Sequence, residues 1–374
     1  MGQRIAHDDL SLLRCVECGQ GLEETPCGDC DWSNFGAGPV ADCCLQCVRC
    51  KTRFPITADG IPVLWTAELR ECMVANAPSA TPLAANATPL SANVSVYNHV
   101  SDDYARYWRK ETRNARRMRN AVLQALGLQH LGQVNRQLRH LDVGCGPGHV
   151  LQWLDDIPAR QYALDVSLAN LRNVKSRTRA FVVLGSADCL PFRDGAFDLV
   201  TEASVLHHIE AWDKAVSEFA RVCAEGGGLI IDCEPSRESK RWSRMAVGLF
   251  ELRWYPYKWL SYVSARKFWF RDTKTARLTF EAAEIHNKPN TGLPLPELAL
   301  MLEKLDLVVR AVRSPDEHLD PKGRLPWQEM LLHALSGHNP LNPEYGWFTV
   351  IARRPERLPV PAQALTAADR ADNL

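Results

Sequence analysis

Cysteine pairs near the start of the sequence have the spacing of metal ligands. Of the thirteen cysteines in 374 residues, eight lie between Cys15 and Cys50, and the pairs Cys15-x-x-Cys18 and Cys47-x-x-Cys50 have the form of knuckles. Thiols crowded in this way indicate metal binding in a reducing compartment, where disulfides do not persist. Because four thiolates can enclose a tetrahedral Zn²⁺ and leave no open position, we predict a structural zinc site with these four ligands.

The other four cysteines of this region leave the ligand assignment open. Cys27, Cys30, Cys43 and Cys44 could form a second zinc site, or they could replace one of the two knuckles. A redox role for Cys27-Gly-Asp-Cys30 would need a βαβ context, which the surrounding sequence lacks. We therefore predict one or two structural zinc ions in a small domain that needs such a crosslink to fold.

A second segment that could do chemistry is the glycine-rich run LDVGCGPGHV. A predicted strand that ends in Asp142 continues into GCGPG (144–148), so the backbone turns without side chains in the way and a ligand can approach closely. The G-x-G-x-G spacing alone fits several cofactor folds or a plain strand-to-helix turn. The next two predicted strands also end in carboxylates, Asp165 and Asp188, at the edge where open α/β sheets bind ligands. Together the three carboxylates predict one binding site.

These residues need a parallel sheet to position them, and the pattern of the chain predicts one. Apolar runs alternate with helical stretches, which is typical of right-handed βαβ crossovers. We therefore predict an α/β fold, with a Rossmann-like sheet of seven strands and helices on both faces. The predicted strands are 140–144, 161–166, 180–185, 197–204, 228–233, 307–312 and 346–354, and the predicted helices are 150–155, 168–176, 211–224 and 295–305.

The run from about Tyr97 to Arg354 resembles the class I S-adenosylmethionine-dependent methyltransferases, in the branch of the ubiquinone and menaquinone methyltransferases. The motifs that carry the resemblance are LDVGCGPG, ALDVS, SADCLPFRDGAFDLV and SVLHHI. It implies that Asp142 and the glycines line the methionine and ribose portion of the cofactor, that Asp165 accepts the ribose hydroxyls, and that Asp188 meets the adenine amine. The implied cofactor residues are Tyr97, Asp142, Gly144, Cys145, Gly146, Asp165, Val166, Ala187, Asp188 and Cys189.

Two adjacent histidines, His207 and His208, are the candidate catalytic residues. Methyl transfer from a sulfonium needs mainly in-line positioning, with a base only for a poorly ionised acceptor. By the resemblance, the segment Thr201–His207 borders the transferred methyl, and we expect His207, at the mouth of the sheet, to be the better base. Both histidines could instead be cap or packing residues.

The cysteine-rich head resembles the small zinc-ribbon activator proteins that partner tRNA, rRNA and release-factor methyltransferases. The pattern includes RFPITADGIPVLW (53–65) after the second knuckle. In those proteins the ribbon stabilises or regulates a separate catalytic chain, whereas here it is fused to one. The predicted domains are 1–72 (zinc ribbon), 73–96 (a linker rich in Ala, Pro, Thr and Asn), 97–354 (methyltransferase) and 355–374 (a disordered tail).

The acceptor is less well defined by the sequence. A helical insertion at about 234–294 is expected to cap the acceptor pocket, and its interleaved basic and aromatic residues could cover an apolar acceptor, stack bases or touch a membrane surface. Arg106–Arg119 carries seven basic residues in fourteen, which form either a solvated helix face or a grip for phosphates.

The charge and hydropathy of the chain argue against two classes of protein, strongly basic nucleic-acid binders and proteins that span a membrane. Lys plus Arg equals Asp plus Glu at 44 each, so no net field favours nucleic acid. No apolar signal region and no run of about 18 apolar residues occurs, so we expect a cytoplasmic protein without a spanning helix. The main hypothesis is methyl transfer to a small-molecule acceptor, or to a lipid- or glycan-linked one, in a biosynthetic pathway. The alternatives are an RNA methyltransferase acting on rRNA or tRNA, and a non-catalytic interaction subunit.

Overall fold

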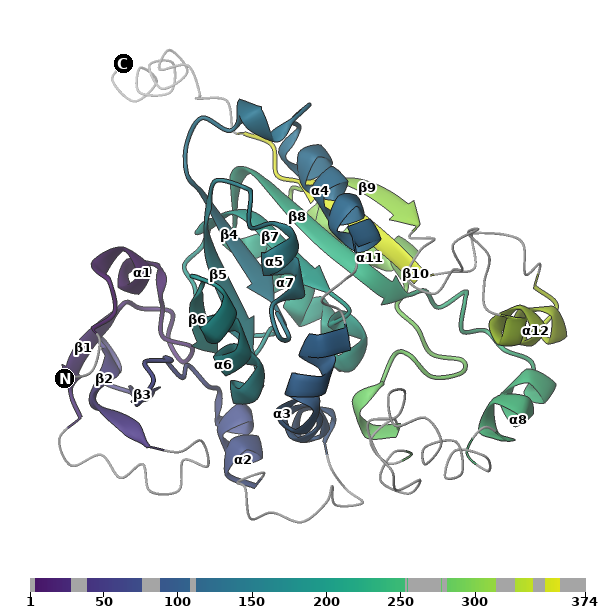
Figure 1. Cartoon of the computed structure of the whole chain (residues 1–374), viewed down its shortest axis with the longest axis horizontal. Helices are drawn as coiled ribbons and strands as arrows, with labels where there is room; N and C mark the ends of the chain where they lie inside the picture. Colours follow the sequence, from purple (N-terminus) through teal and green to yellow (C-terminus); the bar gives the residue numbers. More distant parts are fainter. Residues whose placement is uncertain are drawn as a thin grey trace, which may run out of the picture.

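The computed structural model describes residues 4–27, 39–75, 88–107, 112–252, 254, 277, 281–313, 327–338 and 347–356. Two sheets organise these residues: a small antiparallel sheet in the cysteine-rich head and a large sheet in the body (Figure 1). None of the described helices has the length and apolar character that a membrane span requires.

The large sheet confirms the predicted fold class. Its seven strands follow the order β6-β5-β4-β7-β8-β10-β9, and the first five run parallel while β10 pairs antiparallel with both β8 and β9. Its central strands read as continuous apolar runs because helices cover both faces. The strands are β4 Leu138–Val143, β5 Ala159–Asp165, β6 Phe181–Leu184, β7 Phe197–Ala203, β8 Cys223–Pro235, β9 Val308–Arg313 and β10 Trp347–Arg353.

Alternate residues of the central strands point to helices on opposite faces. Ile230 packs in one core cluster with α4 (Thr112–Leu126) and α5 (His149–Trp153), whereas its neighbours Leu229 and Ile231 belong to the cluster that contains α7 (Trp212–Val222) and α11 (Leu295–Lys304). Helix α6 (Leu168–Arg177) packs beside β5 and β6. The parallel strands therefore all end at one edge, where their carboxyl-terminal residues can meet.

The cysteine-rich head packs against the edge of the large sheet and shares its core. The Leu64 N–H donates to the Leu184 carbonyl at 2.8 Å, and the Leu184 N–H donates to the Pro62 carbonyl at 2.9 Å, so residues 62–64 extend the sheet beyond β6. This pairing covers an edge strand that would otherwise expose its backbone groups. The head contains α1 His7–Leu12, β1 Leu22–Pro26, β2 Val40–Cys47, β3 Arg53–Thr57 and α2 Ala67–Ala75.

The helix α3 (Pro89–Tyr107) begins inside the segment that was predicted to be a linker. Thr88 caps it, because its Oγ1 accepts the Ser91 N–H at 3.2 Å, and Pro89 occupies the first helical position, where a missing N–H costs nothing. The predicted linker boundary at residue 96 is therefore wrong, and residues 76–87 lie outside the described residues.

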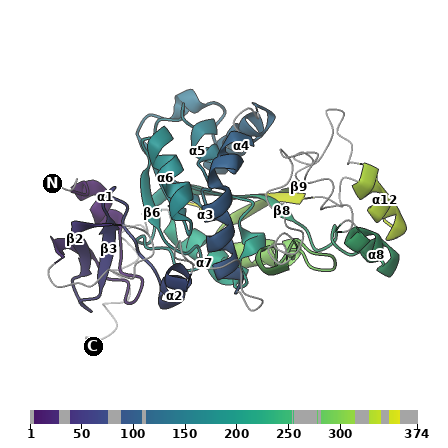
Figure 2. The same ribbon diagram turned by 60° about the horizontal axis from the view of Figure 1, so that its bottom comes forward.

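Part of the predicted cap and tail also lies outside the described residues. Of the cap, the structure describes α8 (Arg244–Leu252) and the loop at 281–293, and α12 (Trp327–Leu335) packs beside α8 at the end of the molecule opposite the head (Figure 2). Residues 357–374 of the predicted tail are not described.

Candidate functional site

The glycine-rich turn after β4 lies against the segment that follows β7. Gly144 has φ +62°, which other residues rarely adopt, and a Cβ there would lie 2.5 Å from a Val205 methyl carbon, so a larger residue would be strained and would displace the Val205 side chain. Gly148 is the N-cap of α5 and also has a positive φ, of +89°. The turn therefore passes from strand to helix with its backbone exposed to the space above the sheet.

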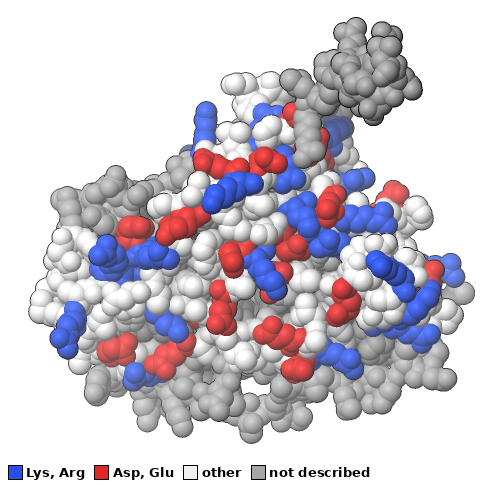
Figure 3. All heavy atoms as spheres, turned by 180° about the vertical axis from the view of Figure 1, so that it is seen from behind, with Lys and Arg blue, Asp and Glu red and all other residues white. Residues whose placement is uncertain are grey.

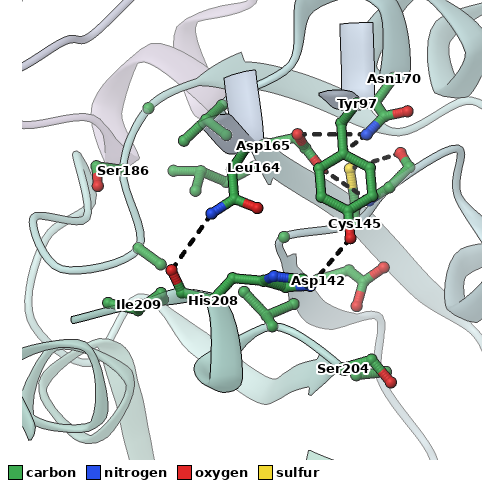
Figure 4. Close-up of a pocket in the computed structure, with 18 of the residues that line it drawn as sticks. Tyr97, Asp142, Cys145, Leu164, Asp165, Asn170, Ser186, Ser204, His208 and Ile209 are labelled. Carbon is green, nitrogen blue, oxygen red and sulfur yellow. Dashed lines mark hydrogen bonds between the residues drawn. The ribbon is translucent and has the colours of Figure 1, made fainter. Parts of the chain in front are cut away.

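A cavity of about 320 Å³ lies at the carboxyl edge of β4, β5, β6 and β7 (Figure 4). Its lining includes nine of the ten residues that the methyltransferase resemblance implies for the cofactor. Two helices that precede the sheet also contribute, through Glu68 of α2 and Asn93 of α3. The nine residues are Tyr97, Asp142, Gly144, Cys145, Gly146, Asp165, Val166, Ala187 and Asp188.

Asp165 joins the glycine-rich turn to the end of β5. Its Oδ2 accepts the Gly146 N–H at 2.8 Å (Figure 4), and its Oδ1 accepts the Ser167 N–H at 2.7 Å. Burial raises its pKa to about 6, although these backbone donors favour the ionised form. Asn170 Nδ2 also lies 3.5 Å from Oδ1 and 3.4 Å from Oδ2, at the long limit for a hydrogen bond, so ligand hydroxyls would compete with Asn170 for these oxygens.

Asp142 leaves one buried oxygen without a partner. Thr201 Oγ1 donates to Asp142 Oδ1 at 2.8 Å, and His140 Nε2 lies 2.8 Å from the same Thr201 oxygen. Asp142 Oδ2 is buried and makes no hydrogen bond within the described part of the chain. Burial raises the pKa of Asp142 to about 7. An unpaired carboxylate oxygen beside a cavity fits a ligand with a positive charge.

The loop after β6 carries Ala187 and Asp188 into the cavity but turns Cys189 away from it. Ser186 donates its hydroxyl to the Asp188 carboxylate. The Cys189 thiol instead faces the Val16 carbonyl of the head at 3.7 Å, and Cys189 does not line the cavity. The expectation that Cys189 packs against a bound adenine is therefore wrong, because this side chain serves the contact between head and body.

His208 faces the cavity and has defined hydrogen-bond roles. Its Nδ1 lies 2.9 Å from the Ala283 carbonyl, which can only accept, so Nδ1 carries the proton in the neutral ring. Nε2 then accepts the hydroxyl proton of Tyr97 at 2.9 Å (Figure 4). Burial, together with the nearby His207, lowers the pKa of His208. A neutral imidazole in contact with a phenol therefore lies in the wall of the cavity.

His207 lies behind the cavity wall, which corrects the expectation that it is the better base. It is 3% exposed and does not line the cavity. Its Nδ1 is 2.9 Å from Glu234 Oε2, and its Nε2 is 3.4 Å from Glu284 Oε2. Burial opposes its charge, but Glu234 outweighs that effect and raises the pKa of His207. His207 is therefore placed to hold the turn and the loop that carries Glu284.

Glu234, at the end of β8, is a site residue that sequence reasoning missed. Its carboxylate accepts the N–H groups of Val205, Leu206 and His207 at 2.7, 2.9 and 3.0 Å, which closes the short 3₁₀ turn Leu206–His208. The signal was available, since an acidic residue follows the fifth apolar strand in GLIIDCEP. Glu284 contacts this turn as well.

His207, His208 and Glu284 also bring possible metal-ligand atoms within 4.8 Å of one another. Both ring nitrogens of His208 are already engaged, one with Ala283 and the other with Tyr97. A cation would have to displace one of these contacts, so the arrangement is better described as a hydrogen-bonded network.

The cysteine knuckles converge as the spacing predicts. The sulfur atoms of Cys15, Cys18, Cys47 and Cys50 all lie within 4.8 Å of one another, with Cys15–Cys50 at 3.6 Å and Cys18–Cys47 at 3.4 Å. Sulfurs placed tetrahedrally 2.3 Å from zinc would be about 3.8 Å apart. Burial raises the pKa of the Cys15 thiol to about 12, so an anionic cluster needs a cation. Donor set and spacing therefore fit Zn²⁺.

The two knuckles also share one backbone turn. In the first, the Cys15 N–H donates to the Gln20 carbonyl and the Gly19 N–H donates to the Cys15 carbonyl. In the second, Cys47 and Lys51 make the same two bonds, and Lys51 has the same left-handed backbone as Gly19. In each knuckle this turn places the two cysteine sulfurs on the same side of the backbone.

The remaining cysteines of the head are not gathered in the same way. Among the described residues, Cys27, Cys43 and Cys44 belong to no group of three or more metal-binding side chains. The Cys44 sulfur lies 3.4 Å from Thr25 Oγ1. Cys30 lies outside the described residues, so the second set stays a prediction.

Comparisons with known proteins agree with this geometry. The family model described as "Methyltransferase domain" matches residues 141–231. The chain is 34% identical over 115 residues to the ajmaline N-methyltransferase of Rauvolfia serpentina, a match that covers 26% of this chain and 39% of that protein. It is 36% identical over 118 residues to the demethylmenaquinone methyltransferase of Renibacterium salmoninarum, covering 31% and 47%.

The matched region spans less than half the length of these two relatives. Among solved structures, the [4+2]-cyclase SpnF is 17% identical, with a TM-score of 0.42, over 72% of this chain and 98% of that one. The matched residues 141–231 contain the glycine-rich turn, Asp165, Asp188 and the two histidines. Residues 141–231 of the chain therefore resemble a methyltransferase domain.

Proposed function

We propose that the chain transfers a methyl group from S-adenosylmethionine to a small-molecule or lipid-linked acceptor. The observation that carries the proposal is the unpaired, buried Oδ2 of Asp142 beside the cavity. S-adenosylmethionine supplies an electrophilic methyl on a cationic sulfur, with an ammonium group close by. Asp142 would hold the cationic methionine end, Asp165 the ribose hydroxyls and Asp188 the adenine amine.

The charge of the cavity wall favours an acceptor without phosphate near the reacting atom. The described lining contains acidic side chains and neither Lys nor Arg, and a phosphodiester would meet repulsion there. The acidic lining residues are Glu68, Asp142, Asp165, Asp188 and Glu210. Both relatives are named for small organic acceptors, ajmaline and demethylmenaquinone, which supports the same class.

The arginine-rich helix gives little support to the RNA alternative. Arg117 forms an ion pair with the buried Asp232, and Arg119 pairs with Asp156 at 2.9 Å, so these two charges face partners within the protein. Arg106, Arg109, Lys110 and Arg113 lie outside the residues whose side chains are described, and Arg116 is exposed. On the face of the molecule in Figure 3, Lys and Arg are mixed with Asp and Glu and form no broad basic surface.

His208 is the residue that we propose to receive the proton of the acceptor. Its Nε2 is basic in the neutral ring and is already bonded to the Tyr97 hydroxyl, which lies at the same cavity wall. A neutral base is available at pH 7 because its pKa is lowered. Tyr97 would then position the acceptor atom between its hydroxyl and His208.

We further propose that the four clustered cysteines bind one zinc ion and that the head supports the cofactor site. The backbone of the head contacts both sides of the loop that carries Asp188. The Leu64 N–H bonds to the Leu184 carbonyl before this loop, and the Arg14 N–H bonds to the Pro191 carbonyl after it, at 3.0 Å. A folded head therefore restricts the loop at the adenine end of the cavity.

Calorimetry with S-adenosylmethionine tests the proposed cofactor directly. We expect binding to the full chain, and the Asp165→Ala variant should bind at least about 100-fold more weakly, because it loses the acceptors for two hydroxyls and the bonds that hold the turn. Asp198→Ala is the control, because Asp198 lies at the amino end of β7, away from the carboxyl ends of the strands that form the cavity. This variant should bind S-adenosylmethionine as the wild type does. Absence of binding by the wild-type chain would refute the proposed function.

The pH dependence of this binding tests the role of Asp142. Because the pKa of Asp142 is about 7 in the free protein, a cationic ligand must displace its proton at lower pH. The affinity should therefore rise by up to about tenfold per unit between about pH 5 and pH 7, and level off above about pH 8. In Asp142→Asn the affinity should be lower and the slope between about pH 6 and pH 7 should become shallower, while the contribution of Asp165 below about pH 6 remains. An equal slope in both proteins would assign the proton to another group.

Removal of the metal tests the coupling between the head and the cofactor site. We expect about one zinc per chain by elemental analysis, and its loss in Cys18→Ser. Chelation should lower the thermal midpoint and weaken S-adenosylmethionine binding by about tenfold, or 1.4 kcal/mol, because the loop that carries Asp188 loses its support. Cys44→Ser should keep its zinc. Unchanged cofactor affinity in the zinc-free protein would contradict the coupling.

Variants of His208 and of His286 test whether His208 is the base. The protein is incubated with labelled cofactor and a cell extract separated into RNA, protein and small-molecule fractions, and we expect label in the small-molecule fraction. His208→Asn should lower this transfer about 100-fold with little change in cofactor affinity. His286→Asn, in the loop that contacts the same turn, is the control and should stay close to wild type. Equal transfer by the two variants would exclude His208 as the base.

A further inference from the structure

Helix α8 presents an apolar face to solvent. Met245, Leu249 and Leu252 follow one another at spacings of four and three residues, so they lie on one side of the helix. Their side chains are 58%, 40% and 54% exposed. Ala246, about 100° around the helix from Met245, is buried. The three exposed side chains therefore lie on a different face of α8 from the one that packs against the protein.

The neighbouring helix α12 also exposes a leucine. The two helices are joined where they meet, because Ser243 Oγ donates to the Leu335 carbonyl at 2.7 Å and the Ser243 N–H donates to Ser336 Oγ at 3.0 Å. Leu331 of α12 is 45% exposed. Both helices lie at the end of the molecule away from the head (Figures 1 and 2). We call Met245, Leu249, Leu252 and Leu331 the α8–α12 face.

The charges next to the α8–α12 face are basic. Arg244, the first residue of α8, and Arg241, three residues before the helix, are exposed, and neither forms an ion pair with a carboxylate in the described part of the chain. Arg244 directly precedes Met245 in the sequence. The carboxylate of Glu251 on the same helix is paired with Arg277 at 3.4 Å. The surface next to the apolar row therefore attracts anions.

We propose that the α8–α12 face docks on the surface of an anionic lipid bilayer. A short amphipathic helix with apolar side chains on one face and arginines beside them binds at the interface between lipid headgroups and acyl chains, where the arginines meet lipid phosphates. The sequence that continues from α8, RWYPYKWLSYVSARKFWFR at 253–271, has the basic and aromatic composition of such interfaces. The proposal goes beyond methyl transfer and does not depend on it.

Cosedimentation of the full chain with lipid vesicles tests the proposal. We expect binding to phosphatidylcholine vesicles that contain about 30% phosphatidylglycerol, and at least tenfold weaker binding to pure phosphatidylcholine. The double variant Met245→Asp, Leu249→Asp should bind anionic vesicles at least tenfold more weakly than wild type. Arg241→Gln, Arg244→Gln should lose most of the preference for anionic lipid. Leu300→Asp, at a leucine 52% exposed on α11, is the matched control and should bind as wild type does.

Three outcomes would overturn the proposal. The first is wild-type protein that stays in the supernatant with anionic vesicles, and the second is equal binding by the double variant and the Leu300→Asp control. The third is a wild-type dimer by light scattering that the double variant abolishes, which would assign the face to a second copy of the chain. Circular dichroism and S-adenosylmethionine calorimetry on each variant separate loss of docking from loss of the fold or of the cofactor site.

Discussion

The carboxylate of Asp165 is the group on which the geometry of the cavity depends. By accepting the Gly146 and Ser167 N–H groups, it fixes the turn after β4, the end of β5 and the start of α6 relative to one another. Burial disfavours the ionised form of Asp165. A buried apolar side chain at this position would cost less folding free energy than a buried carboxylate. Such a conflict between stability and local chemistry is typical of binding sites.

The sequence was sufficient to predict the large sheet and the meeting of Asp142, Asp165 and Asp188. Parallel strands with helices on both faces appear as apolar runs, and their carboxyl ends necessarily share one edge. The cysteine spacing was equally informative, because two residues between thiols allow a single turn to bring both sulfurs to one side. In both cases a local pattern was enough to define a contact between distant residues.

Other features depend on contacts that no local pattern contains. His207 and His208 are adjacent, and only the 3₁₀ turn closed by Glu234 of β8 decides that His208 faces the cavity. Cys189 follows Asp188 directly, yet its thiol meets Val16, which is distant in the sequence. The pairing of residues 62–64 with β6 involves three residues, too few for a strand to be recognised. In each of these three cases, a contact with a residue distant in the sequence determines the local structure.

This last pairing affects the order in which the protein can assemble on the ribosome. Residues 62–64 leave the ribosome well before the β6 backbone against which they pair. At about 5–20 residues per second the delay is on the order of ten seconds. During that time a bound metal ion would be the main force that keeps the nascent head folded, and the apolar residues Val63 and Leu64 would remain open to chaperones.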